Sequence, residues 1–289
     1  MTGLKQLRNR VKSIKSTQKI TKAMHVVSAA KLRKIKEQAE NLNSYSMVLG
    51  NIMNDIATGS NIIDLPAETR KFFSKKLKEM THLLVVLTSE RGLCGSFNTS
   101  VIRKVKSDIE QLNNEGKQVK LLVVGKKGWD VLNAQYSHMI AGYYPNNHDT
   151  ECMSKKVKNM IVELVESGEV GACYVYYNKF KNAMMQILTK DRILPAKDNG
   201  EAEKNTVSEY EYEGEELVHR IINLYISGQL NYAMLQSKAS EEGARMTAMD
   251  NATNNASELV DKLTLKLNRS RQAIITTELT EIISGAEAV

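Results

Sequence analysis

The chain has 289 residues, of which 42% are hydrophobic, 25% charged and only 6% aromatic, and its formal net charge is +7. The apolar and charged fractions are typical of a folded protein, the scarcity of large rings indicates that part of the chain is extended, and the positive charge favours an acidic partner. The three cysteines, Cys94, Cys152 and Cys173, have no CxxC spacing, which argues against a disulfide scaffold or a zinc site and fits a reducing compartment. The longest aliphatic run, Leu83 to Leu87, is far shorter than the roughly 20 apolar residues of a membrane-spanning helix.

The amino-terminal segment has a heptad pattern that predicts one long helix over about 3–58. The first proline is Pro66, so nothing in this segment interrupts a helix. Apolar residues alternate by three and four along one seam, which consists of Leu4, Leu7, Val11, Ile14, and then Leu32, Ile35, Ala39, Leu42, Leu49, Met53 and Ile56.

The middle of this seam is polar. Its positions are Gln18, Thr21, His25 and Ser28, and the apolar side of the helix shifts there to Ile20, Ala23, Met24 and Val27. A shift of this kind predicts a local change in the supercoil or in the partner of the helix.

The first helix is also strongly basic, because residues 1–36 carry eleven Lys or Arg and no Asp or Glu. An acid-poor basic start is typical of a mitochondrial transit peptide, but here the apolar pattern continues past any plausible cleavage point. Nucleic-acid binding is disfavoured, since the cations lie around much of the helix and no aromatic side chain is present to stack on bases. An acidic protein surface is the better match.

The middle of the chain begins with two strand-and-helix units. The apolar run 82–88 predicts a buried strand, followed by a glycine turn and a helix over 99–112. A second strand over 119–124 leads into a turn with Gly125 and Gly128 and then a further helix.

Two more strands are expected at 172–177 and 184–189, joined by the polar turn 178–182. Strands that alternate with helices indicate a mostly parallel, Rossmann-like sheet, and the short turn before residue 184 indicates one antiparallel edge strand.

The glycine turns match phosphate-binding loops only loosely. The first lacks the GxGxxG pattern and the second lacks the Lys-Ser/Thr ending of a P-loop, so we prefer tight strand-to-helix turns to a nucleotide site. Cys94 has no His near it in sequence and is expected to be a buried structural thiol, and the five histidines are scattered without metal-ligand spacing. We therefore expect no catalytic residue, no bound cofactor and no metal.

The carboxyl-terminal segment has a second, longer heptad pattern, preceded by an acidic stretch over 198–216 that predicts a solvated linker. The seam consists of Met246, Met249, Thr253, Ala256, Val260, Leu263, Leu267, Ser270 and Ile274. Alanines at 244, 248, 252 and 256 let a second helix approach closely. We expect this helix, over about 214–284, to pair with the first.

The predicted fold class is mixed α+β and α/β, with a long antiparallel two-helix coiled coil formed by the chain ends and a central Rossmann-like domain. The boundaries are 1–60 for the first helix, 61–200 for the α/β domain, and 201–289 for the acidic linker and the last helix. The helices would span about 80 Å and about 105 Å. The carboxyl end would therefore protrude by about two nanometres and require an external sleeve.

Five ordered motifs resemble those of the gamma subunit family of F-type ATP synthases, of the bacterial type. They are STQKITKAM with AAKLR at 16–33, ERGLCG at 90–95, YNKF at 177–180, EGARMTAM at 242–249 and SRQAIITTELTEIISG at 270–285. Together they span nearly the whole chain.

The resemblance implies a central-stalk rotor, present in one copy, whose coiled coil lies inside a hexamer of alpha and beta subunits. The α/β domain would sit on the membrane c-ring beside the epsilon subunit. Such a rotor transmits torque between ring and hexamer and regulates ATPase activity and proton flow. ATP chemistry takes place on beta, so the chain would not itself be an enzyme. It would be a peripheral membrane protein on the cytoplasmic face of the bacterial inner membrane.

The resemblance also implies a set of rotor–stator contact residues. By motif position, Met24 lies where the shaft meets an acidic lever of beta, and Lys19, Lys22 and Arg33 add charge attraction. The positions that would interact with this region or with a beta loop are Arg245, Gln272, Thr276 and Glu278. The residues that suit an apolar bearing at the shaft end are Ile282, Ile283, Ala286, Ala288 and Val289.

Two alternatives stay open from the residues alone. One is a coiled-coil scaffold without ATPase partners, and the other is a basic nucleic-acid-binding coiled coil. Plastid relatives carry a regulatory Cys pair, and because no paired Cys lies in the middle of this chain, we expect no thiol switch.

Overall fold

The computed structural model describes residues 2–58, 67–73, 81–146, 149–195 and 215–287. The chain folds into two compact units. One consists of residues 30–244, and the other combines residues 1–29 with residues 245–289.

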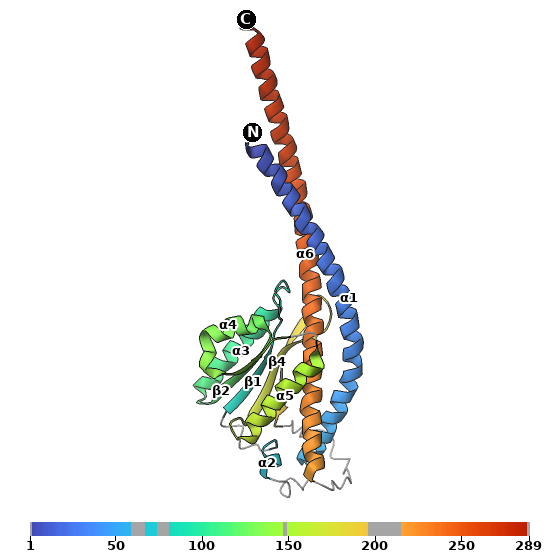
Figure 1. The fold of residues 1–289 in the computed structure, drawn as a ribbon, viewed down its shortest axis with the longest axis vertical. Coiled ribbons are helices and arrows are strands. Elements are labelled where there is room, and N and C mark those ends of the chain that lie inside the picture. The colour runs from blue at the N-terminus through green and yellow to red at the C-terminus, as the bar shows by residue number, and fades with distance from the viewer. Residues whose placement is uncertain (1, 59–66, 74–80, 147–148, 196–214, 288–289) are drawn as a thin grey trace. The chain divides into compact units, whose positions relative to one another are not determined.

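Two long helices belong to both units (Figure 1). Helix α1 runs from Thr2 to Thr58 and helix α6 from Glu215 to Glu287, close to the predicted 3–58 and 214–284. The acidic stretch predicted as a linker lies almost entirely outside the described residues.

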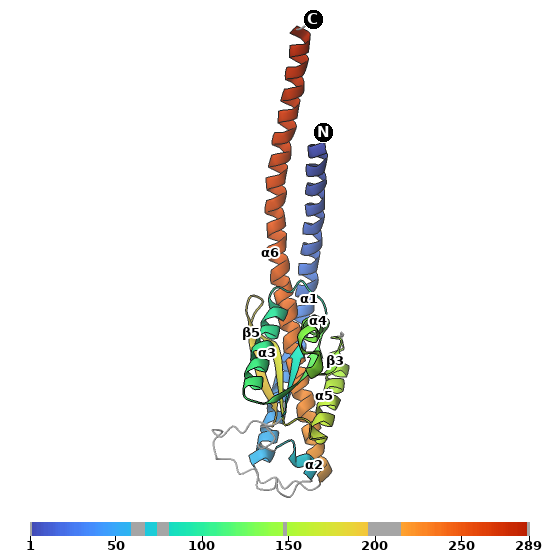
Figure 2. The ribbon, with the colours of Figure 1, turned by 90° about the vertical axis from the view of Figure 1, so that its left-hand side faces the viewer.

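The pairing of α1 with α6 is antiparallel in each unit. In residues 30–244, the Lys31 ammonium lies 3.9 Å from the Glu242 carboxylate, and the Gln229 side chain donates a hydrogen bond to the Ser46 carbonyl at 3.3 Å. Because position 31 of α1 lies beside position 242 of α6 and position 46 beside position 229, the two helices run in opposite directions. In the other unit, Thr21 pairs with Thr253, and the carboxyl end of α6 extends beyond the start of α1 (Figures 1 and 2). The predicted antiparallel coiled coil is confirmed.

The unit of residues 30–244 is built on a five-stranded sheet with the strand order β3-β2-β1-β4-β5. Its strands are β1 (Thr81–Leu87), β2 (Gln118–Val124), β3 (Ile140–Tyr144), β4 (Ala172–Phe180) and β5 (Gln186–Leu194). The first four are parallel to their neighbours, and β5 pairs antiparallel with β4 at the sheet edge. The mostly parallel sheet with one antiparallel edge strand is as predicted.

Helices cover both faces of this sheet. Helices α3 (Phe97–Asn114) and α4 (Lys126–Tyr136) bury Leu84 and Val86 of β1 on one face. Helix α5 (Thr150–Glu166) packs on the opposite face together with residues of α1 and α6. Because every residue of β1 is buried, its sequence is a continuous apolar run rather than an alternating one.

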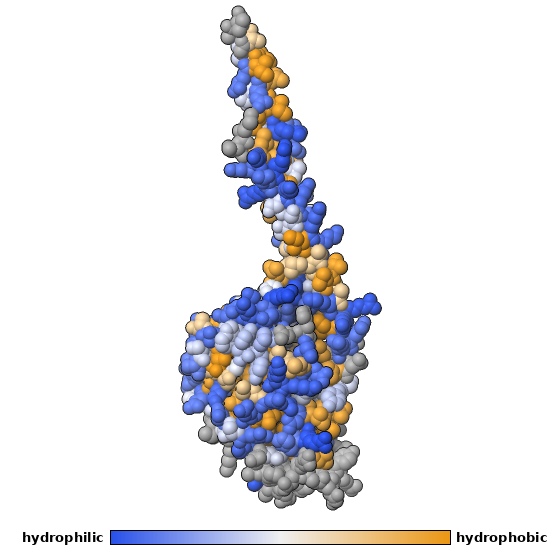
Figure 3. All heavy atoms as spheres, viewed as in Figure 1, coloured by the Kyte–Doolittle hydropathy of each residue, from blue (hydrophilic) through white to orange (hydrophobic). Residues whose placement is uncertain are grey.

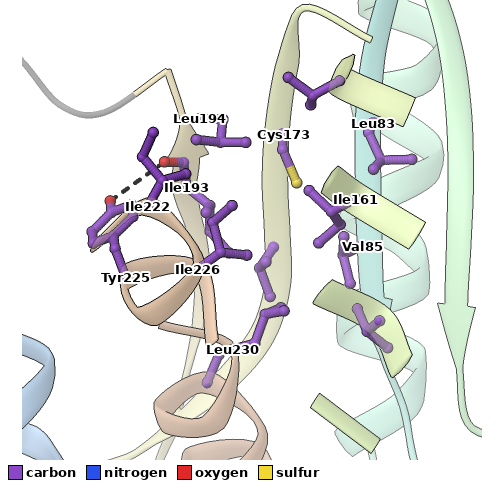
Figure 4. Close-up of a cluster of buried hydrophobic side chains, with 14 of the residues drawn as sticks. Leu83, Val85, Ile161, Cys173, Ile193, Leu194, Ile222, Tyr225, Ile226 and Leu230 are labelled. Atoms are coloured by element: carbon purple, nitrogen blue, oxygen red, sulfur yellow. Dashed lines mark hydrogen bonds between the residues drawn. The ribbon is translucent and has the colours of Figure 1, made fainter. Parts of the chain in front are cut away.

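Each face of the sheet thus has its own hydrophobic core. The core beneath α5 and α6 contains the aliphatic residues of the second sheet face (Figure 4). Leu83 and Val85 of β1 and Cys173 of β4 meet Ile161 of α5. From α6, Tyr225 packs into the same core while its hydroxyl donates a hydrogen bond to the Ile193 carbonyl at 3.3 Å. Residues 218–234 of α6 thus contribute to the core of the α/β unit.

Strand β3 and helix α5 were not predicted, β4 ends three residues later than expected, and β5 runs from Gln186 to Leu194 rather than over 184–189. Strand β3 is half-buried, with Gly142 inside it, and so lacks the aliphatic run that marked β1. The predicted turn 178–182 is wrong in part, because β4 continues to Phe180 and the turn begins at Lys181. Asn178 was predicted to lie in the turn, but it belongs to β4 and is buried. Its side chain donates a hydrogen bond to the Phe97 carbonyl at 2.9 Å. The other short elements are α2 (Ala67–Arg70) and a 3-10 turn over Ser137–Met139.

Candidate contact surface of the paired helices

The polar stretch of the α1 seam is buried against α6. In the unit of residues 1–29 and 245–289, the hydroxyls of Thr21 and Thr253 lie 2.7 Å apart, so one donates to the other. Each hydroxyl also lies within hydrogen-bond distance of a carbonyl on its own helix, at Gln18 and Met249. Buried polar groups are stable when paired in this way, and such a layer fixes the register of a coiled coil.

The apolar side chains of the same stretch face away from α6. Ile20 is 60% exposed, Val26 61% and Val27 54%, and Ala23 is exposed as well. Ile20, Ala23 and Val27 recur at the spacing of one helix face. The predicted shift of the apolar side is therefore an outward-facing stripe, and such a surface is typical of an interaction site.

Four of the expected contact residues lie along α1. Lys19 and Lys22 are exposed beside the apolar stripe, and Met24 is half-buried one turn from Thr21. Arg33 belongs to the other unit, where it is exposed and its Nε lies 3.5 Å from the Glu37 carboxylate. The cations are thus placed on the surface, whereas Met24 lies partly within the helix pair.

The other four expected residues lie on α6 in two groups. Arg245 is only 7% exposed, about two helix turns before Thr253, so it is not a surface cation. Gln272, Thr276 and Glu278 are exposed about 40 to 50 Å further along the helix than Arg245. The Thr276 hydroxyl donates to the Gln272 carbonyl at 3.0 Å. The eight residues therefore form separate patches rather than one pocket.

The projecting end of α6 carries a second apolar surface (Figure 3). Ile275, Leu279, Ile282 and Ile283 are all at least half exposed, and Ile282 reaches 72%. They lie on one side of the helix at spacings of four, three and one residues. Of the residues expected to form a bearing, Ala288 and Val289 lie outside the described residues.

The glycine turns at the carboxyl edge of the sheet are filled by the protein itself. The Glu90 carboxylate accepts hydrogen bonds from the backbone N–H of Lys126 at 3.1 Å and of Asn146 at 2.9 Å. This carboxylate therefore takes the position at the start of α4 where a phosphate would bind in a nucleotide fold. A Cβ on Gly125, whose φ is +99°, would lie 2.2 Å from the Thr88 carbonyl oxygen, so the glycine serves close packing.

Cys94 is buried beside this turn and accepts a hydrogen bond from the Asn98 amide at 3.3 Å. In the part of the chain that the structure describes, no group of His, Cys, Asp or Glu is arranged to hold a metal ion. Within the same described residues, no helix is both long and apolar enough to cross a membrane.

The fold and this surface define a class of protein. Each long helix belongs in part to a three-layer α/β unit and in part to an antiparallel pair, and in the pair two hydrogen-bonded threonines lie inside while several large apolar side chains face outward. Paired helices with exposed apolar side chains are typical of a protein that contacts other molecules.

A family model described as ATP synthase matches residues 3–289. The chain is 54% identical to the ATP synthase gamma chain of Rickettsia felis and 52% identical to that of Rickettsia bellii, with all of this chain and all of each relative covered. The chain therefore belongs to the family of ATP synthase gamma chains.

Solved structures of rotors share the fold. The rotor of the Euglena gracilis mitochondrial ATP synthase matches with a TM-score of 0.68 at 18% identity, covering 95% of this chain and 99% of that one. The central stalk of the Tetrahymena thermophila mitochondrial ATP synthase, solved with its c-ring, matches with a TM-score of 0.62 at 27% identity, covering 81% of this chain and 99% of that one.

Proposed function

We propose that the chain is the central-stalk rotor of a proton-translocating ATP synthase, transmitting torque between a membrane c-ring and a hexamer of alpha and beta subunits. The observation that carries the proposal is the pair of outward apolar surfaces on the helix pair, at 20–27 and 275–283. A free helix pair gains nothing from exposing such residues, whereas a surrounding sleeve would cover them. Membership of the gamma-chain family supports the same reading.

The surface of the helix pair is asymmetric, and the asymmetry supplies a mechanism. The α1 face combines exposed lysines with an apolar stripe, while the projecting end of α6 carries an apolar stripe on one side and polar residues on the other. As the shaft turns, each surrounding subunit would meet a different face in sequence. A ligand shifts a conformational equilibrium only through different affinities for the two states, and unlike faces provide that difference.

The eight residues carried over from the family motifs belong to this proposal as rotor–stator contacts. Exposed Lys19, Lys22 and Arg33 would attract acidic groups of the stator. Arg245 is buried, and its role would be to hold the helix pair around Met24 rather than to touch the stator directly.

The rotor would itself be non-catalytic, with ATP chemistry on the beta subunits. The occupation of the turn before α4 by Glu90 supports this, because a nucleotide phosphate would compete with a carboxylate already in place. We also place the chain on the cytoplasmic face of the bacterial inner membrane, beside an epsilon subunit. The division into 1–60, 61–200 and 201–289 fits a shaft whose helices end near Thr58 and begin near Glu215.

Co-purification from membranes tests the proposal. A tagged chain, extracted with mild detergent, should bring alpha, beta, epsilon and c subunits in one complex with ATPase activity. Removal of the chain should abolish ATP-driven proton uptake by vesicles, and its return should restore uptake. A chain that purifies alone, or with nucleic acid that survives high salt, would instead favour the scaffold or the nucleic-acid-binding alternative.

The placement on the membrane has its own test. Added trypsin should cleave the chain in inverted vesicles and leave it intact in right-side-out vesicles, with a periplasmic protein as the opposite control. Equal cleavage in both preparations would contradict the cytoplasmic placement.

A further inference from the structure

The β4–β5 hairpin ends in a turn with a fixed shape. The Asn182 side-chain oxygen accepts hydrogen bonds from the backbone N–H groups of Met184 at 3.0 Å and Met185 at 2.7 Å. The backbones of Asn182 and Met185 also exchange hydrogen bonds, at 3.1 and 3.3 Å. A turn with four such bonds holds its tip in one conformation.

The tip of this turn is apolar and exposed. Met184 is 86% exposed and Met185 51%, and the next two apolar residues, Ile187 and Leu188, are also exposed. Ordered turns usually carry polar residues, so four large apolar side chains in sequence at one hairpin end require another explanation. We call these residues, 184–188, the methionine tip.

The base of the hairpin is packed against both long helices within the unit of residues 30–244. The Phe180 N–H donates to the Gln236 side chain at 3.2 Å, and the Lys36 ammonium lies 5.6 Å from the centroid of the Phe180 ring. A Cβ on Gly243 would lie 2.9 Å from that ring and 3.5 Å from the Ala183 Cα. Gly243 of α6 leaves room for the base of the hairpin, and this close packing fixes the position of the methionine tip.

Exposed lysines lie beside the tip. Residues 178–190 contain no Asp or Glu, and of their three lysines only Lys190 is paired with a carboxylate among the described residues, that of Asp108 at 2.8 Å. Lys179 and Lys181 are exposed, and Lys36 of α1 adds a third cation beside Phe180. An apolar protrusion with a cationic rim is complementary to an apolar recess with an acidic rim.

Lys36, Lys179 and Lys181 are called the lysine rim. We propose that the methionine tip and the lysine rim form a second docking surface, for a protein partner that presents an apolar recess edged by carboxylates. Flexible thioether side chains adapt to the apolar side chains of a partner, which suits a contact that is repeatedly made and released. Nucleic acid is a poorer occupant because the tip offers no aromatic ring for base stacking. A membrane is a poorer occupant because four apolar side chains on one hairpin bury less area than the whole face of an amphipathic helix. The proposal rests on the proposed function only in that the partner is sought within the ATP synthase complex.

Photo-crosslinking in the intact complex tests the contact. A benzophenone amino acid replaces Met184, and a matched control replaces Val131, an exposed apolar residue of α4 on another part of the same unit. With full assembly and ATPase activity, the Met184 probe should join the chain to another subunit at a peptide rich in Asp or Glu, at least about tenfold above the Val131 probe. Equal yields at both sites, adducts to lipid, or no adduct in an assembled complex would overturn the proposal.

Charge reversal tests the lysine rim. Lys36→Glu with Lys181→Glu should lower the crosslink yield at position 184 by about tenfold, as loss of close charge pairs does, while Lys→Arg at both positions retains it. Lys156→Glu, on the exposed side of α5, is the matched control and should leave the yield unchanged. An unchanged yield after reversal of the rim would contradict an acidic partner. Failure of the proposed function is a separate outcome, since the complex would then not co-purify at all.

Discussion

The two units bury their apolar residues in opposite ways. In residues 30–244, β1 is buried on both faces, and two separate cores fill the space between sheet and helices. In residues 1–29 and 245–289, the inner seam includes paired threonines while isoleucine, valine and leucine side chains face solvent. The first unit has the packing of a self-sufficient domain, and the second has that of a part completed by other molecules.

This difference in burial explains why the heptad positions of α1 and α6 hold different residues in the two units. Where α1 and α6 pack on the sheet, their apolar residues lie inside, as Met53 and Ile222 do. Where the two helices have only each other, the paired threonines and Ser28 share the seam with Met249 and Val260, while Ile20, Val26 and Val27 face outward. The position of the apolar stripe thus reports where the partner lies rather than how stable the helix is.

The largest difference between the units should appear when a leucine is truncated in each. Leu84→Ala should lower the free energy of unfolding by about 2–5 kcal/mol, because Leu84 is fully buried and the variant leaves a cavity. Leu265→Ala should change it by less than about 0.5 kcal/mol, because Leu265 is exposed on α6. Urea denaturation of the full chain, followed by circular dichroism, measures both. Similar losses would contradict the contrast between the units.

The next effect concerns the buried Asp108 carboxylate of the α/β unit. Burial raises the pKa of Asp108, but hydrogen bonds from Lys104, Lys190 and Tyr176 outweigh it and hold the pKa below its usual value. A carboxyl with a lowered pKa stabilises the fold above its unfolded pKa of about 4, and that stabilisation is lost as the pH falls through the folded pKa. Asp108→Asn should therefore cost about 2 kcal/mol at pH 7, a value limited by the access of both lysines to solvent, and it should cost less at pH 3, below the unfolded pKa.

Urea midpoints at the two pH values measure the effect of Asp108→Asn. Glu110→Gln, which changes an exposed carboxylate on the same helix, is the control and should show almost no pH-dependent difference from the unchanged chain. If the cost of Asp108→Asn were the same at both pH values, the ionised carboxylate would not be what stabilises the fold.

A smaller effect is expected in the seam of the helix pair. Thr21→Val should cost about 1 kcal/mol because the Thr253 hydroxyl loses its cross-helix partner. The double variant Thr21→Val with Thr253→Val should cost less than the two single changes together, since neither hydroxyl is then left alone. Thermal unfolding of the four proteins gives the coupling. Strictly additive losses would show that the 2.7 Å contact does not fix the pair.

The smallest change in stability, within about 0.5 kcal/mol, is expected for Met24→Lys, because the residue is half-buried and a lysine stem can reach solvent. Its functional effect is expected to be larger, since it adds a cation to a half-buried position of the helix pair. The ratio of ATP-driven proton pumping to ATP hydrolysis in vesicles should fall several-fold, whereas Asn9→Lys, an exposed change earlier in α1, should leave it unchanged. Normal pumping by Met24→Lys would remove Met24 from the contact residues.

Sequence patterns were enough to predict the two long helices, their antiparallel partnership and the parallel strands β1 and β2. Periodicity carries this information, because an apolar residue every three or four positions is buried only on a helix, and a continuous aliphatic run is buried only in a covered strand. The family motifs carried the functional interpretation. Strand β3 was not predicted because a half-buried edge strand has a weak pattern, whereas α5 did carry a signal, with Asp149 as its N-cap and Met153, Val157, Ile161 and Leu164 on one apolar face.

Only the tertiary structure decided which face of each helix is free. Ile20 and Met53 are both apolar residues of α1, yet the first is mostly exposed and the second is fully buried. The same holds for Met184, which its sequence placed at the start of a strand and which the turn holds out to solvent. Local sequence sets the period of an element, but burial depends on what packs against it, and for α1 that neighbour is distant in sequence, as Thr21 and Thr253 show.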